Sequence, residues 1–426
     1  MALLLTHASE LLTLAGPARA RRGPEMGDLG VVRDGAVLIA GDRIVRAGPT
    51  DAVARALPQG LGEVVEHDCA GMVVTPGLVD SHTHLVFAQP RLADYERRLA
   101  GATYAEIAAA EGGIQSSLAA VRAAAEPELA ADAAHWMRTA RALGTTTIEV
   151  KSGYGLTTEA ECKSLRAAAN AKTAVGGDAP RTYLGAHIVP PEFRHDRAAY
   201  LRLVVGEMLE AVMRPGGGSP EFAPEFADVF CDPAGFSLEE SRTVLMAAKR
   251  KGLKLKLHAE QFAAIGGIGL GVELGAVSVD HCDAARAEDA RLLARAATVA
   301  TLLPGASMFL GRPFAPARLL LEAGSAVALA TDFNPGTCPW LSLPLIMSVA
   351  CSGMRLTPAE AWTAVTINAA AALERTHVCG SLESGKRADV ALFAVDDHRA
   401  VPYYAGQNLC HAVVQNGAWI ANHGND

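Results

Sequence analysis

Short stretches of alternating apolar and polar residues occupy both ends of the chain. Residues 35–49 alternate around a Gly-Asp pair, and residues 411–422 alternate around an Asn-Gly pair. Two such runs joined by a glycine-containing pair are typical of β-hairpins. A further apolar run at 387–396 has the same character. Both ends of the chain are therefore predicted to be rich in β-strands.

Between these ends, alanine-rich helical stretches alternate with short apolar strands, which is typical of parallel sheets whose strands are joined by helices. The strand candidates are residues 73–85, 145–152, 181–189, 226–232, 253–261, 276–282, 298–305 and 326–332. Eight such units predict an α/β fold, with a (β/α)8 TIM-like barrel over residues 71–375. Residues 1–70 and 376–426 are predicted to pack together as a small composite β-sandwich domain.

Composition narrows the class of protein. Half of the 426 residues are hydrophobic, and the net charge of −8 is spread along the chain, so a basic groove for nucleic acid is excluded. The eight cysteines lie far apart, which favours reduced thiols in a cytoplasmic protein. No apolar run is long enough to cross a membrane. We expect a cytoplasmic enzyme with a small-molecule substrate, and a homodimer because dimers are the commonest assembly.

Polar residues fall at the ends of the predicted barrel strands, where enzymes of this fold carry their catalytic groups. They are His82, His84, Lys151, His187, His258, His281 and Asp332. In a strand, residues two apart point to the same face, so His82 and His84 can both face the barrel axis. Each histidine, taken alone, has an alternative interpretation: it could be an ordinary strand-end residue that only completes a hydrogen bond in the core.

Taken together, His82, His84, His258 and Asp332 offer a ligand set for a divalent transition metal. A cation there lowers the pKa of water from about 15.7 to about 7. Asp332 could accept the proton of the attacking water and pass it to a leaving nitrogen. His281 could orient the nucleophile or polarise a carbonyl.

Lys151 could suggest a second metal, because binuclear enzymes of this type bridge their metals with a carbamylated lysine on strand four. The fourth strand candidate, 226–232, has no lysine, and Lys151 lies on the second. One metal is therefore expected. Lys151 could have a structural role, such as pairing with Glu149, or a role in the active site, and the sequence leaves both open. Glu260 comes one residue before Gln261, so it is expected to point the other way and to be structural.

Several motifs occur in order along the barrel: PGLVDSHTHL, EVKSGYGL, GAHIVP, KLHAEQ, SVDHC, TLLPGAS and ATDFNPGT. With them the chain resembles the imidazolonepropionase family of the amidohydrolase superfamily. The resemblance implies hydrolysis of 4-imidazolone-5-propanoate to N-formimidoyl-L-glutamate in histidine degradation, with zinc or iron held by His82, His84, His258 and Asp332. It also implies substrate contacts from Arg91, Tyr154, His187, Gln261, Asn334, Gly336 and Thr337.

The chemistry of these residues agrees with that substrate. Arg91 offers a bidentate partner for the propionate. The alternative is that Arg91 is a solvated surface residue with no ligand. Tyr154 lies between glycines on a loop, and His187 could hold the ring carbonyl oxygen. A tight turn at Pro335 would present Asn334, the Gly336 amide and Thr337 to the substrate. Segments 88–90 and 111–114 depart from the family's pattern, and the 214–224 loop is longer than usual.

Two other functions remain open. A deaminase of a purine- or pyrimidine-like ring would use the same metal site, but it needs a proton-shuttling carboxylate where this chain has Gln261. A scaffold that has lost catalysis would be expected to have a broken ligand set, yet all four ligands are present.

Overall fold

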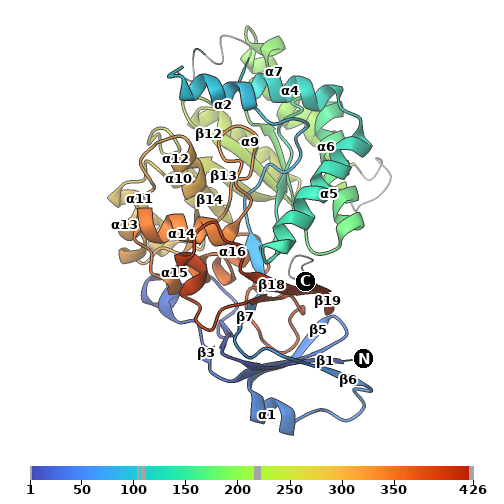
Figure 1. Cartoon of the computed structure of the whole chain (residues 1–426). Coiled ribbons are helices and arrows are strands. Elements are labelled where there is room, and N and C mark those ends of the chain that lie inside the picture. Colours follow the sequence, from blue (N-terminus) through green and yellow to red (C-terminus); the bar gives the residue numbers. More distant parts are fainter. Residues whose placement is uncertain (1, 103–105, 107–111, 215–221, 422–426) are drawn as a thin grey trace.

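Parallel strands alternating with helices build the larger part of the molecule (Figure 1). The computed structural model describes residues 2–102, 106, 112–214 and 222–421. The parallel strands are β8 (Leu78–Asp80), β9 (Thr145–Ile148), β10 (Val150–Lys151), β11 (Arg181–Ala186), β12 (Phe226–Cys231), β13 (Lys254–Ala259), β14 (Ser278–His281), β15 (Val299–Leu302) and β16 (Val327–Leu329). Strands β10 to β16 form one sheet in chain order, and β8 pairs with β9.

The parallel strands curl so that the chain after β8 lies between the two edges of the larger sheet. Thr83 forms a parallel bridge with Phe333, which follows β16. On the other side, the Lys151 amide donates to the Thr83 carbonyl at 3.1 Å. Strand order and curl are consistent with the predicted TIM-like barrel.

Helices between the strands cover the outside of the curled sheet (Figure 1). They include α5 (Glu126–Ala142), α6 (Thr158–Val175), α7 (Arg197–Leu203), α8 (Leu209–Met213), α9 (Leu238–Arg250), α10 (Gly267–Leu274), α11 (Ala287–Arg295), α12 (Pro304–Phe309), α13 (Ala317–Glu322), α14 (Leu343–Met354), α15 (Pro358–Ala364) and α16 (Ile367–Ala371). Helix α9 illustrates the local causes: Ser237 and Glu240 form a capping box at its start, and Val244 and Leu245 are buried.

Further helices lie outside this set. They are α1 (Thr50–Arg55), α2 (Leu92–Leu99), α4 (Ile114–Ala123) and α17 (Ala400–Tyr403), with the 3-10 helices η1 (Gly23–Gly27) and η2 (Pro191–Phe193) and the π-helical segment η3 (Val204–Met208). Figure 1 shows α2 and α4 at the end of the molecule farthest from α1 and β6. Among the described helices, none combines the length and apolar character that crossing a membrane demands.

Two mixed sheets lie at the other end. One has the order β5 (Arg43–Pro49), β4 (Gly35–Ala40), β1 (Ala2–Ala8), β6 (Val64–Asp68). The other has the order β19 (Ala418–Ala421), β18 (Cys410–Gln415), β17 (Val390–Phe393), β7 (Val73–Pro76), β2 (Glu10–Leu12), β3 (Val31–Val32). Both predicted hairpins are confirmed, and Asn416 and Gly417 have the positive φ of a two-residue hairpin turn.

The second mixed sheet joins strands from both ends of the chain. Strand β17 pairs with β7, and β7 in turn pairs with β2. A buried apolar cluster contains Leu5 and Val37 from the first sheet together with Val74 and Val390 from the second. The two sheets therefore share apolar packing.

The first predicted barrel strand, 73–85, is instead two strands in two different sheets. Strand β7 belongs to a mixed sheet and β8 to the barrel strands. Pro76 has no amide hydrogen to continue the ladder, and a side chain at Gly77 would lie 2.2 Å from the Thr146 hydroxyl. The chain passes from one sheet to the other at Pro76 and Gly77. Of the long loop at 214–224, residues 215–221 lie outside the described part, as does residue 111 of the divergent 111–114 segment.

An ion-pair network ties the parallel strands to the C-terminal segment. Asp178, before β11, accepts from Arg375 at 3.0 Å and from Arg387 at 3.1 Å. Burial acts to raise the pKa of Asp178, but the two arginines outweigh it and hold that pKa below its usual value. The contribution of this carboxylate to stability is therefore present above the usual pKa and is lost as the pH falls through the lowered one.

We expect Asp178→Asn to lower the free energy of unfolding by about 3 kcal/mol at neutral pH, because it leaves two partly buried guanidinium groups without a shared carboxylate. Urea unfolding followed by circular dichroism measures this, and the difference from wild type should shrink under acid conditions. Asp51→Asn, at an exposed carboxylate paired with Arg55, is the matched control. A loss no greater than that of the control would contradict the expectation.

Candidate metal centre and active-site pocket

Four side chains from three strand ends converge on one point. His82 and His84 follow β8, His258 lies in β13, and Asp332 follows β16. The Nε2 atoms of His84 and His258 are 3.3 Å apart. Asp332 Oδ1 lies 3.5 Å from His82 Nε2 and 3.5 Å from His84 Nε2. The structure thus brings together the four residues expected to bind a metal.

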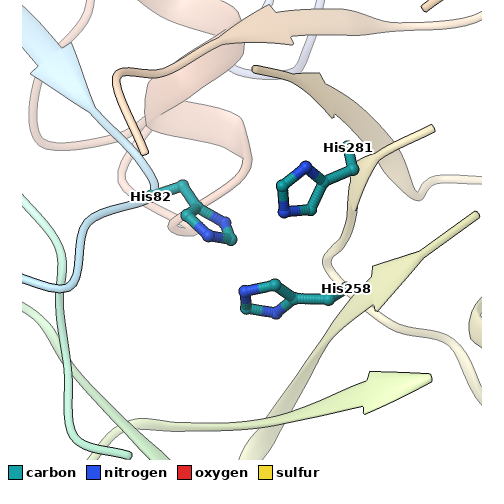
Figure 2. A group of neighbouring side chains, drawn as sticks. All are labelled: His82, His258 and His281. Carbon is teal, nitrogen blue, oxygen red and sulfur yellow. The ribbon is translucent and has the colours of Figure 1, made fainter. Parts of the chain in front are cut away.

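His281, at the end of β14, also faces this point. Figure 2 shows the rings of His82, His258 and His281 around a common space. Their nearest ligand atoms lie within 4.8 Å of one another. The ring centroid of His281 is 5.3 Å from that of His258 and 5.7 Å from that of His82. By distance, His281 is as well placed to touch a metal as to touch a substrate.

Carboxylates behind the histidines fix which ring nitrogen faces inward. His82 Nδ1 lies 2.6 Å from Asp280 Oδ2, and His258 Nδ1 lies 2.9 Å from Asp228 Oδ2. A carboxylate only accepts, so His82 Nδ1 carries the hydrogen and His82 Nε2 has a bare lone pair, and the nearby Asp228 carboxylate favours the same tautomer of His258. His82 Nε2 is buried and has no hydrogen-bond partner. Inward lone pairs oriented by outer carboxylates are the arrangement that metal-binding histidines adopt.

Burial sets the protonation of these groups. Burial, helped by Lys151, lowers the pKa of His82 well below its usual value, and burial with His187 does the same for His84. Both rings are neutral, the form that binds metals. Burial also raises the pKa of Asp332 to about 6. Neutral imidazoles and one carboxylate fit a divalent transition metal.

A buried network of charged residues supports these carboxylates. Lys151 Nζ lies 2.7 Å from Glu149 Oε1 and 2.9 Å from Asp228 Oδ2, and Lys256 Nζ lies 3.5 Å from Asp280 Oδ2. Burial acts to lower the pKa of Lys151, but Asp228 and Glu149 raise it overall. Lys151 is therefore a charged partner of the carboxylates that hold the histidines.

Four residues at the strand ends have positive φ: His281 at 77°, Cys282 at 59°, Asp332 at 53° and Glu260 at 52°. None is glycine, so each conformation is unfavourable for an isolated residue and is imposed by the surrounding fold. Such strain gathers at functional sites, and here it coincides with the converging side chains.

A pocket of about 80 Å³ adjoins the histidines. Its lining includes most of the residues expected to touch substrate, namely Arg91, Tyr154, His187, Gln261, Asn334 and Thr337, with His84, His258, His281 and Asp332. Gly336 lies outside this lining. Asp332 is the single carboxylate lining the pocket within the described part of the chain.

Arg91 is the cation of this pocket. Its Nε donates to Ser117 Oγ at 2.8 Å, and its guanidinium lies 5.6 Å from the centre of the Tyr154 ring. Its Nη2 is buried without a hydrogen-bond partner, and no carboxylate of the described residues forms an ion pair with it. A half-buried guanidinium whose Nη2 is buried and has no partner is suited to bind an anion.

His187 can accept a hydrogen bond from a ligand but is not arranged to donate one. Its Nδ1 lies 2.9 Å from the Gly153 carbonyl, which only accepts, so Nδ1 carries the hydrogen. Burial and His258 lower the pKa of His187 to about 3, so the ring is neutral and its Nε2 has a lone pair. The geometry thus favours a ring N–H of the substrate as its partner, in place of the carbonyl oxygen expected from the sequence.

The turn after Asp332 is held by Asn334. The Asn334 Oδ1 accepts from the amides of Gly336 and Thr337 at 2.8 and 2.7 Å, and its Nδ2 donates to Thr337 Oγ1 at 2.7 Å. The Gly336 amide is therefore used within the turn. A Cβ at Gly336 would lie 2.1 Å from Arg91 Nη1, so this glycine leaves room for the guanidinium.

The side chain of Glu260 binds backbone amides at the start of α10, whereas that of Gln261 faces the pocket. The Glu260 carboxylate accepts from the amides of Gly266, Gly267 and Ile268 at 2.7 to 2.8 Å, and this confirms its expected structural role. Gln261 lines the pocket. A deaminase-type proton shuttle at position 261 is absent because glutamine cannot carry the proton.

Sequence patterns missed two groups of residues. Phe230 and Phe262 line the pocket, and Asp228 and Asp280 orient the histidines. The two aspartates were weakly indicated by the sequence, because each lies on a predicted strand next to a strand that carries a histidine. The phenylalanines carried none, since an aromatic residue at a strand end is equally typical of a core.

Known proteins agree with this picture. A family model described as the amidohydrolase family matches residues 73–419. An imidazolonepropionase of Geobacillus kaustophilus is 44% identical over 99% of this chain and 98% of its own. An imidazolonepropionase of Chloroflexus aggregans is 45% identical over 97% of each chain.

Solved structures of more distant proteins share the fold. Guanine deaminase of E. coli matches with a TM-score of 0.72 at 13% identity, over the full length of both chains. An adenosine deaminase of Xanthomonas campestris with bound zinc matches with a TM-score of 0.68 at 18% identity, covering 98% of this chain and 92% of its own. These likenesses concern the fold alone.

Proposed function

Because the chain belongs to the amidohydrolase family, and within it to the imidazolonepropionases, we propose that it hydrolyses 4-imidazolone-5-propanoate. Water adds across the ring amide: the carbonyl carbon becomes a carboxylate, the C–N bond breaks and the nitrogen gains a proton. The product is N-formimidoyl-L-glutamate, an intermediate of histidine degradation.

The observation that carries this proposal is the unpaired Arg91 guanidinium in the pocket beside the converging histidines. A substrate with a propionate tail supplies the missing anion, and its ring then lies toward His258 and Asp332. A neutral purine or pyrimidine ring supplies no such group. Gln261 in place of a shuttling carboxylate further favours the amide hydrolysis.

The metal would be held by His82, His84, His258 and Asp332, as one zinc or iron ion per chain. Bound there, it would polarise the substrate carbonyl and lower the pKa of water. The inward lone pair of His82 Nε2 and the carboxylate of Asp332 support this assignment. Metal supply decides between zinc and iron as much as affinity does.

Side chains of the protein carry out the proton transfers and bind the substrate. Asp332 takes the proton of the attacking water and delivers it to the leaving nitrogen. His281 orients the nucleophile or donates to the carbonyl oxygen, and His187 Nε2 accepts from a ring N–H. Arg91 binds the propionate, and Tyr154 packs beside that guanidinium. Gln261, Asn334, Gly336 and Thr337 complete the substrate contacts, Gly336 by leaving space for Arg91.

We also propose that the chain divides into a (β/α)8 barrel over residues 71–375 and a composite β-sandwich of residues 1–70 and 376–426. The mixed sheet that joins strands from both ends supports this division, with β7 as the strand that links the two parts. A homodimer in the cytoplasm is proposed in addition, the location because all eight cysteines are free.

The test is turnover of freshly generated 4-imidazolone-5-propanoate, followed by its loss of ultraviolet absorbance, with metal content assayed on the same sample. Fast loss with about one metal per chain supports the proposal. A sample that keeps its metal but leaves the substrate intact would reject the substrate, and ring deaminations would then be tested.

Gly336→Ala is expected to raise KM about tenfold, because the new methyl group displaces the Arg91 guanidinium and weakens a charged hydrogen bond. Metal content and kcat should change little, because the methyl group does not reach the histidines. Gly27→Ala is the matched control, since a Cβ there meets no atom within 4 Å. An unchanged KM in the Gly336 variant would show that the position of Arg91 does not limit substrate binding.

A further inference from the structure

The active-site pocket continues outward into a larger cavity of about 460 Å³. Arg91, Phe262 and Thr337 line both spaces. The cavity is walled by α2 and by the segments that follow β12, β13, β15 and β16, so it lies on the side where the strands carry their functional groups. A molecule that reaches the histidines from this side passes through it.

Cations dominate the wall of this outer cavity. Arg91, Arg98 and Arg312 line it, against one carboxylate, Asp94. Asp94 already accepts from the Gly113 amide at 2.7 Å. Within the described chain, the contacts of the Arg98 and Arg312 guanidinium groups are with aromatic rings, and neither group takes part in an ion pair. An unpaired cluster of this sign stands out on a chain whose net charge is −8.

Aromatic rings hold the two outer guanidinium groups by their faces. Arg98 lies 4.2 Å from the centre of the Phe309 ring and 5.5 Å from that of Tyr95, and Arg312 lies 4.6 Å from that of Phe262. Stacking of this kind restrains a guanidinium while leaving the N–H groups at its edge available. Those groups match the oxygens of a carboxylate.

We propose that Arg98 and Arg312 form an outer carboxylate-binding site, through which the anionic substrate enters and the product leaves. This inference rests on the proposed function. The substrate brings one carboxylate, and hydrolysis of its amide creates a second. The product therefore carries two carboxylates beside its basic formimidoyl group and must move away from Arg91, and the two outer arginines offer a carboxylate a binding site nearer to solvent.

The test is the double variant Arg98→Gln/Arg312→Gln, which removes two charges but keeps polar side chains of similar length. Its kcat/KM at low ionic strength is expected to fall about tenfold, chiefly through KM, because neither arginine touches the reacting atoms. Added salt should lower kcat/KM in the wild type and have little effect in the variant. Arg138→Gln/Arg202→Gln removes the same charge elsewhere on the surface and serves as the control.

A second measurement does not depend on turnover. Glutarate, a simple dicarboxylate, is titrated into the metal-loaded proteins by calorimetry, and its Kd should rise about tenfold in the Arg98/Arg312 variant and stay unchanged in the control. If the wild type binds glutarate in this way but does not turn over the imidazolone, the proposed function fails while the anion site stands. Equal KM, salt response and glutarate affinity in the double variant and the wild type would overturn the outer site.

Discussion

Asp332→Ala is expected to abolish measurable turnover of 4-imidazolone-5-propanoate, with kcat falling about 10³-fold or more. The residue has two proposed functions, as a metal ligand and as the carrier of the proton from water to the leaving nitrogen. Its Oδ1 faces both His82 and His84 at 3.5 Å, and burial raises its pKa to about 6. The measurement is the rate of ultraviolet loss, with metal content on the same sample.

Asp332→Asn separates the two functions. Asparagine keeps an oxygen that can bind metal, but it cannot take up a proton, so we expect metal to be retained while turnover is still lost. Asn also tolerates the positive φ of 53° at this position, which protects the fold of the variant. Asp51→Asn, far out on α1, is the control. Turnover within tenfold of the wild type in a metal-loaded Asp332 variant would remove this residue from the mechanism.

The convergence of the site could be predicted from strand ends. His82, His258 and Asp332 lie on three separate strands, and a parallel barrel brings the carboxyl ends of its strands to one face. Alternation along a strand placed His84 beside His82. Both inferences use only local pattern and topology, and the distances between these residues agree with them.

The supporting interactions could not be predicted in the same way. That Lys151 pairs with Asp228 depends on which strands are neighbours and on the register between them, and neither is written in a local pattern. The relation between Gly336 and Arg91 is a matter of a few ångströms between two loops far apart in sequence. The break after Pro76 was visible as a Pro-Gly pair, but the apolar residues on either side of it read as one strand.

His281→Ala is expected to lower kcat by about 10² to 10⁴-fold while metal content and KM change little, because the proposed role of His281 is to orient the nucleophile or donate to the carbonyl oxygen. Its Nδ1 lies 3.7 Å from Asp283 Oδ2. Burial acts to lower the pKa of His281, but Asp283, Asp332 and Asp280 raise it overall, so the ring is suited to hold a proton. A group that donates a proton differs from a metal ligand, which must be neutral.

The distances alone permit the other role, because His281 lies in one group with His82 and His258 (Figure 2). Metal content after dialysis, measured by plasma mass spectrometry, distinguishes the two. His281→Asn is made alongside the alanine variant, since asparagine accommodates the φ of 77° and lowers the risk that a loss of metal reflects a disturbed backbone. His377→Ala, at an exposed histidine, is the control. Loss of metal from both His281 variants would make His281 a ligand. One of the four residues assigned here as ligands would then not bind the metal.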